Sequence, residues 1–188
     1  MSDRPLRLAV IIASTRTGRF GETVARWFVT RAQQHDDLQL DVIDLYGLQL
    51  PDNLDDSPQT KAFTARIDAA DAFVIVTPEY NHGYPAGLKR AIDAVRDEWR
   101  AKPVGFVSYG GLAGGLRAVE QLRQVFAELH AVGIRDTVSF HMAYDQFDSD
   151  GQVRDPETAN TAAATLLRQL VWWARALHAA RVAQPYPA

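Results

Sequence analysis

Five short apolar segments alternate with helix-like segments along the chain, and this alternation limits the fold more than any other feature. The apolar segments cover residues 6–14, 38–45, 72–77, 103–109 and 136–140. Several are nearly continuous runs of Val, Ile and other apolar residues, which is typical of strands buried on both faces. A helix after each strand implies right-handed crossovers, so the pattern predicts an α/β fold with a parallel sheet covered by helices on both faces.

The helical segments have the lengths and end signals of ordinary globular helices. They are expected over residues 21–34, 59–69, 85–95, 112–132 and 156–180. Asp155 is placed to cap the last helix, with Pro156 at its first position. A chain of 188 residues suits one domain with a full core, and we expect only about residues 181–188 to form a frayed tail.

Charge and composition argue against several classes of function. The formal net charge of -3 is unfavourable for a broad surface that binds nucleic acid or an anionic membrane. The absence of cysteine excludes disulfides, thiol nucleophiles, thiolate zinc sites and cysteine-ligated iron–sulfur clusters. No segment approaches the ~20 apolar residues of a membrane span, and the first residues do not match a signal peptide. We therefore expect a cytoplasmic protein with neither membrane nor nucleic-acid partners.

The loop after the first apolar segment is polar and precedes a helix. In parallel sheets of this kind, ligands bind beyond the carboxyl ends of the strands. The loop lies within ASTRTGRFGETVARWF, residues 13–28, and its hydroxyls, glycines and two arginines fit a phosphate group at a helix N-terminus. It matches neither GxxxxGK[ST] nor GxGxxG, so a polar loop with a capped helix stays open as an alternative.

The loop after the third apolar segment, within TPEYNHGYPAGLKRAIDA, is richer in special residues than a plain connector needs. Two prolines stiffen its ends, and Gly83 permits an unusual backbone angle or a close approach. Tyr80, His82 and Tyr84 offer flat faces. This loop fits a planar heteroaromatic ring, and it fits a rigid structural turn equally well.

The loop after the fourth apolar segment, SYGGLAGGLRA at residues 108–118, contains four glycines. Their amides would be exposed above the end of the sheet. The segment is not a GxSxG hydrolase elbow, because Phe106 stands where the first glycine belongs. A helix N-terminus that uses glycines for close packing is the alternative.

Taken together, ASTR, PEYNHGYPAGLKRAID and SYGGLAGG resemble the motifs of the NADPH-dependent FMN reductase family. Members carry a GSxR-type loop, a PEYNxxxPxxLKNAID stretch and a Gly-rich SxGG segment after the first, third and fourth strands. The middle motif is the specific one, and the resemblance covers nearly the whole chain. It implies a flavodoxin-like three-layer sandwich with a five-stranded parallel sheet of order 2-1-3-4-5.

The resemblance also implies which residues bind FMN. The expected set is Ser14, Arg16, Arg19, Phe20, Gly21, Pro78, Glu79, Tyr80, Asn81, Ser108, Gly110 and Gly111. Ser14 and Arg16 match the phosphate-binding Ser and Arg of the family. Arg19 and Gly21 fall where many members carry Ser and Asn, and Ala13 replaces the usual Gly.

The same resemblance implies an activity. Residues 78–81 match a loop whose backbone lies against the flavin ring, and residues 108–111 match the segment on the other polar edge of the ring. Reduced nicotinamide from NADPH or NADH would give hydride to flavin N5. A second acceptor, such as free flavin, a quinone, an azo compound or a metal oxyanion, would then react by a ping-pong mechanism. His82 and Tyr84 would shape the pocket of this acceptor, and neither a catalytic side chain nor a metal ion is required.

Other interpretations stay open. A non-enzymatic, flavodoxin-like electron carrier is the main alternative to the enzyme, and a protein of this fold without flavin is another. Residues 146–157 nearly fit a calcium loop, but Gln146 replaces the first Asp, so a turn before a capped helix explains them better. The resemblance points to a homodimer or homotetramer, and Trp172 with the apolar stripe of the last helix can serve an interface or an intramolecular core.

Overall fold

The computed structural model describes residues 4–48, 50–51, 53 and 55–187. Its centre is a five-stranded parallel sheet of order β2-β1-β3-β4-β5, which confirms the predicted topology. The strands are β1 (Leu6–Ile12), β2 (Leu38–Asp44), β3 (Ala72–Pro78), β4 (Pro103–Tyr109) and β5 (Val132–Phe140). Every residue of β3 and β4 is buried, as their continuous apolar character predicts.

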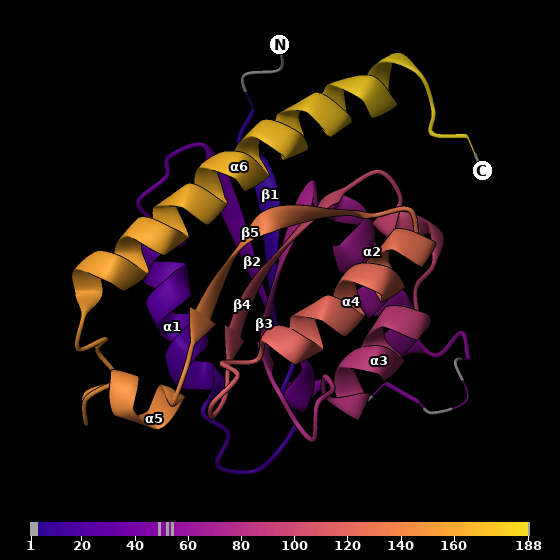
Figure 1. Cartoon of the computed structure of the whole chain (residues 1–188). Coiled ribbons are helices and arrows are strands. Elements are labelled where there is room, and N and C mark those ends of the chain that lie inside the picture. Colours follow the sequence, from indigo (N-terminus) through magenta and orange to yellow (C-terminus); the bar gives the residue numbers. More distant parts are fainter. Residues whose placement is uncertain (1–3, 49, 52, 54, 188) are drawn as a thin grey trace.

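Helices cover both faces of the sheet, so the architecture is a three-layer sandwich (Figure 1). The helices are α1 (Gly21–Ala32), α2 (Pro58–Ala69), α3 (Ala86–Asp93), α4 (Leu116–Glu128), α5 (Ala143–Gln146) and α6 (Pro156–Ala183), with 3-10 turns η1 (Leu45–Gly47) and η2 (Asp97–Trp99). Helices α1 and α6 lie on one face, and α2, α3 and α4 lie on the other. Among the described residues, none of the helices combines the length and the apolar character that a membrane-spanning helix requires.

The alternation of side chains along the strands divides the core in two. Leu8 and Val10 of β1 pack in the cluster that includes α1 and α6. Ala9 and Ile11 pack in the cluster that includes α2, α3 and α4. Because successive residues of a strand point to opposite faces, one central strand supplies both cores.

Most element boundaries differ from the sequence prediction by a few residues, and the connection between α4 and β5 shows the clearest difference. Helix α4 ends at Glu128, and β5 begins at Val132 instead of residue 136. His130 lies between them with a φ of 57°, and this left-handed residue ends the helix and turns the chain back toward the sheet. The strand therefore takes Val132, which the pattern had placed in the helix, and residues 133–135, which it had placed in the connection.

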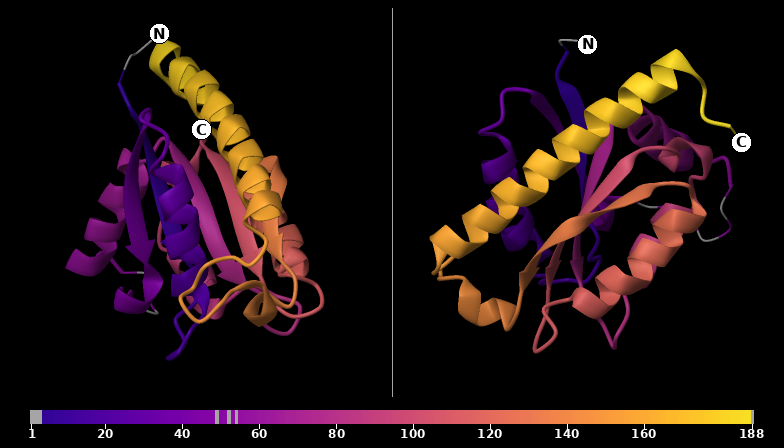
Figure 2. Two further views of the ribbon diagram at one scale, coloured as in Figure 1. Left: turned by 90° about the vertical axis from the view of Figure 1, so that its left-hand side faces the viewer. Right: turned by 45° about the horizontal axis from the view of Figure 1, so that its top comes forward.

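The last helix also runs further than expected. Asp155 caps α6 through the N–H of Thr158, as predicted, but α6 continues to Ala183 instead of residue 180. Figure 2 shows α6 extending past the end of the sheet at which β1 begins. In the expected tail, Ala188 lies outside the described residues, and the Tyr186 hydroxyl lies 3.0 Å from Nδ1 of His130.

Candidate functional site

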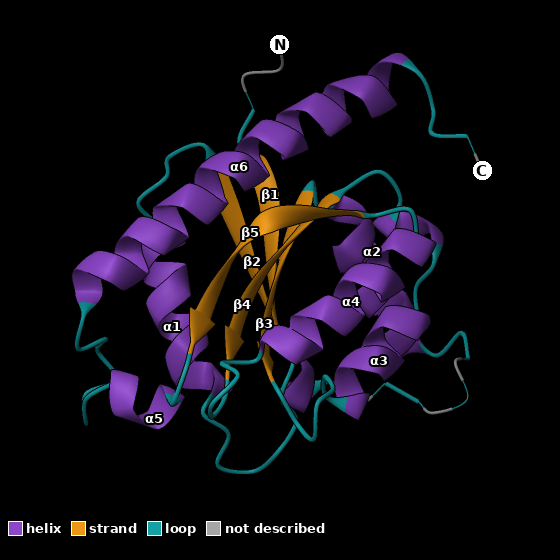
Figure 3. Ribbon diagram, in the orientation of Figure 1, coloured by secondary structure: helices purple, strands orange, loops and turns teal. Residues whose placement is uncertain are grey.

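A cavity of about 370 Å³ lies at the carboxyl ends of the central strands. It is lined by Arg16, Thr17, Gly18, Arg19, Phe20, Pro78, Glu79, Tyr80, Tyr109, Gly110, Gly111, Ala143 and Tyr144. Figure 3 shows the loops after the strands gathered at this end of the sheet. The fold thus brings together the three loops singled out in the sequence and adds residues from α5.

Four expected cofactor-binding residues do not line the cavity. Ser14 and Ser108 are fully buried, and Gly21 is buried at the first position of α1. Asn81 is exposed in the turn after β3. Ser108, Gly21 and Asn81 are nevertheless each next in sequence to a lining residue, and Ser14 lies two residues before Arg16.

The loop after β1 offers donors for an anion. The backbone N–H groups of residues 15–19 donate to no other group in the described part of the chain. Phe20, the N-cap of α1, provides no side-chain cap. The guanidinium of Arg16 lies over the ring of Tyr80, with its Cζ 3.7 Å from the ring centroid. Amides, a helix N-terminus and an arginine together suit a phosphate group.

Arg19 is engaged differently from Arg16. Its side chain is 4% exposed, and its Nη2 pairs with the carboxylates of Glu22 and Asp44. Its guanidinium also lies over the ring of Tyr46. Because two carboxylates neutralise this cation, Arg19 attaches the loop after β1 to the end of β2 and contributes less charge to the cavity than Arg16 does.

The loop after β3 forms a tight turn. Tyr80 N–H donates to Gly83 O at 2.9 Å, and Gly83 N–H donates back to Tyr80 O at 3.0 Å. The left-handed angles fall on Asn81, with a φ of 50°, and His82, with a φ of 69°. Gly83 serves close approach instead, since a Cβ there would lie 3.3 Å from Oε1 of Gln121. This turn presents its backbone edge beside the cavity.

Glu79 links two loops of the site. Its carboxylate accepts from the backbone N–H of Arg117 at 3.2 Å and pairs with the guanidinium of Arg117 at 3.1 Å. Its side chain is 10% exposed. Arg117 is in the first turn of α4, so Glu79 holds the loop after β3 against the loop after β4.

The glycine loop after β4 folds back onto the strand. Ser108 Oγ donates to Gly114 O at 2.8 Å, and a Cβ at Gly115 would lie 2.7 Å from Cβ of Ser108. Gly115 has a φ of 84°, which only glycine adopts readily. Gly111 has no atom within 4 Å of its Cβ position, so its backbone faces open space beside the cavity.

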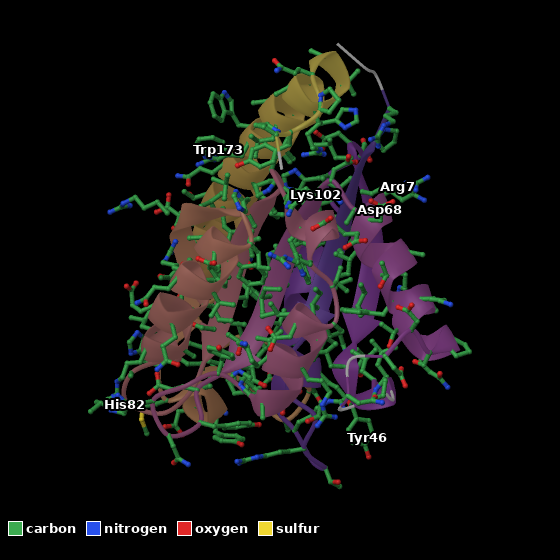
Figure 4. The ribbon with its side chains drawn as sticks, turned by 90° about the vertical axis from the view of Figure 1, so that its right-hand side faces the viewer. Arg7, Tyr46, Asp68, His82, Lys102 and Trp173 are labelled. Carbon is green, nitrogen blue, oxygen red and sulfur yellow. The ribbon has the colours of Figure 1, made fainter. Side chains whose placement is uncertain are left out.

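The two residues expected to shape the acceptor pocket do not line the cavity. His82 is exposed and lies at the rim of the molecule in Figure 4. Tyr84 is partly buried against the core cluster that includes α2, α3 and α4, and this burial raises the pKa of its hydroxyl. An aromatic wall comes instead from Phe20 and Tyr144, whose ring centroids are 4.8 Å apart.

Sequence reasoning missed Tyr109 and Tyr144. Tyr109 is the last residue of β4, directly before the glycines, and its position there was a usable signal. Its hydroxyl is buried and has no hydrogen-bond partner in the described residues. Tyr144 carried no such signal, because it reaches the site only when the segment after β5 folds back as α5.

Comparison with known proteins identifies relatives of the whole site region. Residues 6–145 match the family model described as NADPH-dependent FMN reductase. An NAD(P)H-dependent FMN reductase of Schizosaccharomyces pombe is 36% identical over 132 residues, which cover 63% of this chain and 64% of that protein. The chain thus spans somewhat less than two thirds of the length of that relative. A probable NADPH:quinone oxidoreductase of Oryza sativa is 31% identical over 168 residues, 83% of each chain.

Solved structures agree on the fold. A flavoenzyme NAD(P)H:(acceptor) oxidoreductase from Paracoccus denitrificans superposes with a TM-score of 0.73 at 22% identity, covering 90% of this chain and 98% of that one. A flavodoxin of Streptococcus pneumonia TIGR4 superposes with a TM-score of 0.58 at 16% identity, covering 87% and 99%. With the matched family model and the three motif loops around one cavity, these similarities establish that the chain belongs to the NADPH-dependent FMN reductase family and has the flavodoxin-like fold.

Proposed function

We propose that this protein is an FMN-dependent NAD(P)H oxidoreductase that reduces a small-molecule acceptor. One observation carries the proposal: a single cavity is bounded by all three motif loops, with anion donors on one side and an aromatic wall on the other. A flavin mononucleotide has the matching shape, because it joins a phosphate to a flat ring. The family match supports the same cofactor.

The residues present fit FMN at both of its ends. Arg16 and the backbone N–H groups of residues 15–19 would hold the phosphate. The N–H groups of Tyr80 and Gly110 already donate to Gly83 and Phe140 within the protein. The N–H groups of Asn81 and Gly111 donate to no described group, so these two amides would bind the polar edge of the ring.

The protein itself supplies positioning for this chemistry. Bound FMN would take a hydride from NADPH or NADH and pass it to a second acceptor in a ping-pong sequence. Phe20 and Tyr144 would limit the space beside the ring and exclude water from it. Pro78 and Pro85 keep the turn after β3 rigid, so its amides are in place before the flavin binds.

Steady-state oxidation of NADPH and of NADH tests the proposal. The assay is run with and without added FMN, using a quinone, an azo dye, a metal oxyanion and free FMN as acceptors. A quinone is the acceptor we favour, because two relatives are named as an NADPH:quinone oxidoreductase and a 2-hydroxy-1,4-benzoquinone reductase. FMN-dependent turnover is the expected result. FMN binding without turnover of either nicotinamide would favour the electron carrier instead.

We also propose that the protein acts as a cytoplasmic homodimer or homotetramer. A largely apolar groove of about 600 Å³ lies along α6, where Trp172 is 64% exposed and Val182 is 73% exposed. An interface there would bury these side chains. Light scattering on the wild type and Trp172→Arg should show an oligomer that dissociates, whereas Leu112→Arg, at an exposed site elsewhere, should not change the mass. Fractionation of producing cells tests the location.

A further inference from the structure

Three consecutive residues of the loop after β1 contact the segment between β3 and the first turn of α3. Ser14 Oγ shares a hydrogen bond of 2.7 Å with the Tyr80 hydroxyl. The guanidinium of Arg16 lies over the ring of the same tyrosine, with its Cζ 3.7 Å from the ring centroid. Thr15, between them, packs on the first turn of α3 beside Gly87. The segment whose motif points to the flavin ring therefore also contacts the loop that offers donors for an anion.

Gly87 leaves the space that Thr15 occupies. A Cβ at position 87 would lie 2.9 Å from Cγ2 and 3.1 Å from Oγ1 of Thr15. Ordinary contacts between carbon atoms are about 3.5–4.0 Å long, so Thr15 would have to move. Gly87 is the second residue of α3 and has no left-handed backbone angle, so its conformation does not require glycine. The close approach of Thr15 accounts for a glycine in a helix, where glycine is otherwise unfavourable.

A shift of Thr15 would pass to the cavity side of the loop. On the strand side, Ser14 is fully buried and hydrogen-bonded to Tyr80. On the other side, Thr15 and Arg16 are exposed, and the N–H groups of residues 15–19 donate to no described group. Because the strand side is held in place by close packing, a displaced Thr15 would move these amides and Arg16. They are the groups that would hold the phosphate in the proposed site.

We propose that Tyr80 and Gly87 are positioning residues for the phosphate of FMN, because they hold the loop after β1 in the conformation that binds it. Tyr80 contacts Ser14 through its hydroxyl and Arg16 through its ring. Gly87 does not line the cavity and acts only through Thr15. The preference for FMN over a flavin without phosphate thus depends on a segment outside the phosphate-binding loop. The inference rests on the proposed FMN site.

The test compares FMN with riboflavin, which has the same ring and no phosphate. Dissociation constants are measured by flavin fluorescence for the wild type, Gly87→Ala, Thr15→Ala and the double variant. We expect Gly87→Ala to weaken FMN binding about 10-fold and to change riboflavin binding by less than about 2-fold. When Thr15→Ala is already present, Gly87→Ala should change FMN binding by less than about 2-fold. The reason is that the nearest remaining atom of residue 15, its Cβ, lies 3.6 Å from the new Cβ.

Tyr80→Phe tests the second contact independently. It keeps the ring under Arg16 and removes the hydroxyl that is bonded to the buried Ser14. We expect FMN binding to weaken about 3-fold, with riboflavin binding unchanged. Gly133→Ala is the matched control, because a Cβ there would meet its nearest atom at 3.6 Å and lies outside the cavity. This control should bind both flavins like the wild type.

Three results with a folded Gly87→Ala variant would overturn the positioning role and leave the FMN site standing. They are unchanged FMN binding, an equal loss of both flavins, and a loss of FMN that persists when Thr15→Ala is present. Circular dichroism checks that the variant is folded. If it is not, Tyr80→Phe decides, and unchanged FMN binding in that variant would overturn the role. A wild type that binds no FMN would overturn both the positioning role and the proposed function.

Discussion

The two ends of the sheet treat their polar groups in opposite ways. At the amino end, the buried carboxylate of Asp71 accepts two hydrogen bonds of 2.8 Å from Arg4 and one of 2.9 Å from the Arg7 N–H. Lys102, which is 6% exposed, donates to the carbonyls of Ile67 and Asp68 at the end of α2. At the carboxyl end, the Tyr109 hydroxyl and the amides of the loop after β1 have no described partner.

Figure 4 shows the separation, with Arg7, Asp68 and Lys102 at one end of the molecule and Tyr46 and His82 at the other. Buried charged groups persist only where partners replace the water that they lost, so removing one partner from such a group is strongly destabilising. Donors that are held in place without an acceptor are available to a ligand. The comparison assigns stability to the amino end and binding to the carboxyl end.

The largest expected effect is on stability and comes from Asp71. We expect Asp71→Ala to lower the free energy of unfolding by about 3 kcal/mol, because it leaves Arg4 and the Arg7 N–H without their acceptor. FMN affinity of the folded variant should be unchanged. Denaturant unfolding measures the loss, and Asp97→Ala, which removes an exposed pair with Arg100, should change it by less than about 0.5 kcal/mol.

The Asp71 contribution should also depend on pH. Burial alone would raise the pKa of this carboxyl, but the hydrogen bonds from Arg4 and Arg7 outweigh it and hold the pKa below its usual 3.8. A lowered folded pKa means that the stabilisation is present above the unfolded value and is lost as pH falls through the folded value. The stability difference between wild type and Asp71→Ala should therefore be constant near neutral pH and shrink below about pH 4. If the stability difference between wild type and Asp71→Ala stayed constant well below pH 4, the hydrogen bonds of Arg4 and Arg7 to an ionised Asp71 would be contradicted.

The next effect tests close packing at the site. Gly21→Ala places a Cβ 2.6 Å from the Tyr109 hydroxyl oxygen, so we expect a loss of about 1–3 kcal/mol in stability together with weaker FMN binding. Adding Tyr109→Phe removes the clashing oxygen and should restore most of the stability. Thermal melts of the single and double variants provide the measurement. Failure of the second change to restore stability would mean that another neighbour limits position 21.

A smaller effect is expected from the link between the loops after β3 and β4. Glu79→Gln keeps the shape of the side chain but removes the ion pair with Arg117. We expect FMN and riboflavin to bind more weakly by the same factor of about 3, since in the proposed site this loop would lie beside the ring and away from the phosphate. Glu120→Gln, in an exposed pair with Arg123, is the control for a lost surface charge. A selective loss of FMN would place Glu79 near the phosphate instead.

The smallest effect on folding should come from the aromatic wall. Tyr144 is 77% exposed, so Tyr144→Ala should change the free energy of unfolding by less than about 0.5 kcal/mol. The KM of this variant for a quinone acceptor should nevertheless rise, because the Tyr144 ring borders the cavity beside Phe20. Leu112→Ala, at an exposed residue that does not line the cavity, is the control. An unchanged KM would remove Tyr144 from the acceptor site.

The fold was predictable because it depends on patterns that are local in sequence. The continuous apolar run of β3 and the helical spacing after it identify a buried strand and its crossover helix. The boundary between α4 and β5 was not predicted, because it depends on a left-handed His130, and the weak preference of His for this conformation does not identify the position. Helix α5 was missed because four residues are too short for a periodic pattern.

The site was predictable only in part. The loops around Arg16 and Pro78 stand out through their residue types and lie where parallel sheets bind ligands. The sequence did not show which side chains line the cavity, since the partly buried Tyr84 packs against the core while Tyr144 comes from a distant segment. Nor did the sequence indicate that Arg19 is neutralised, because Asp44 reaches it from the end of β2.

The most direct measurement is a titration of the wild type and Arg16→Ala with FMN and with riboflavin. Our account predicts saturable FMN binding that is tighter than riboflavin binding. Arg16→Ala should weaken FMN binding by about 10-fold or more and leave riboflavin binding nearly unchanged, because in the proposed site this guanidinium, which lines the cavity, would pair with the phosphate. No saturable binding at high micromolar FMN, or an Arg16→Ala variant that binds FMN like the wild type, would contradict the assignment of the unpartnered donors to a flavin phosphate.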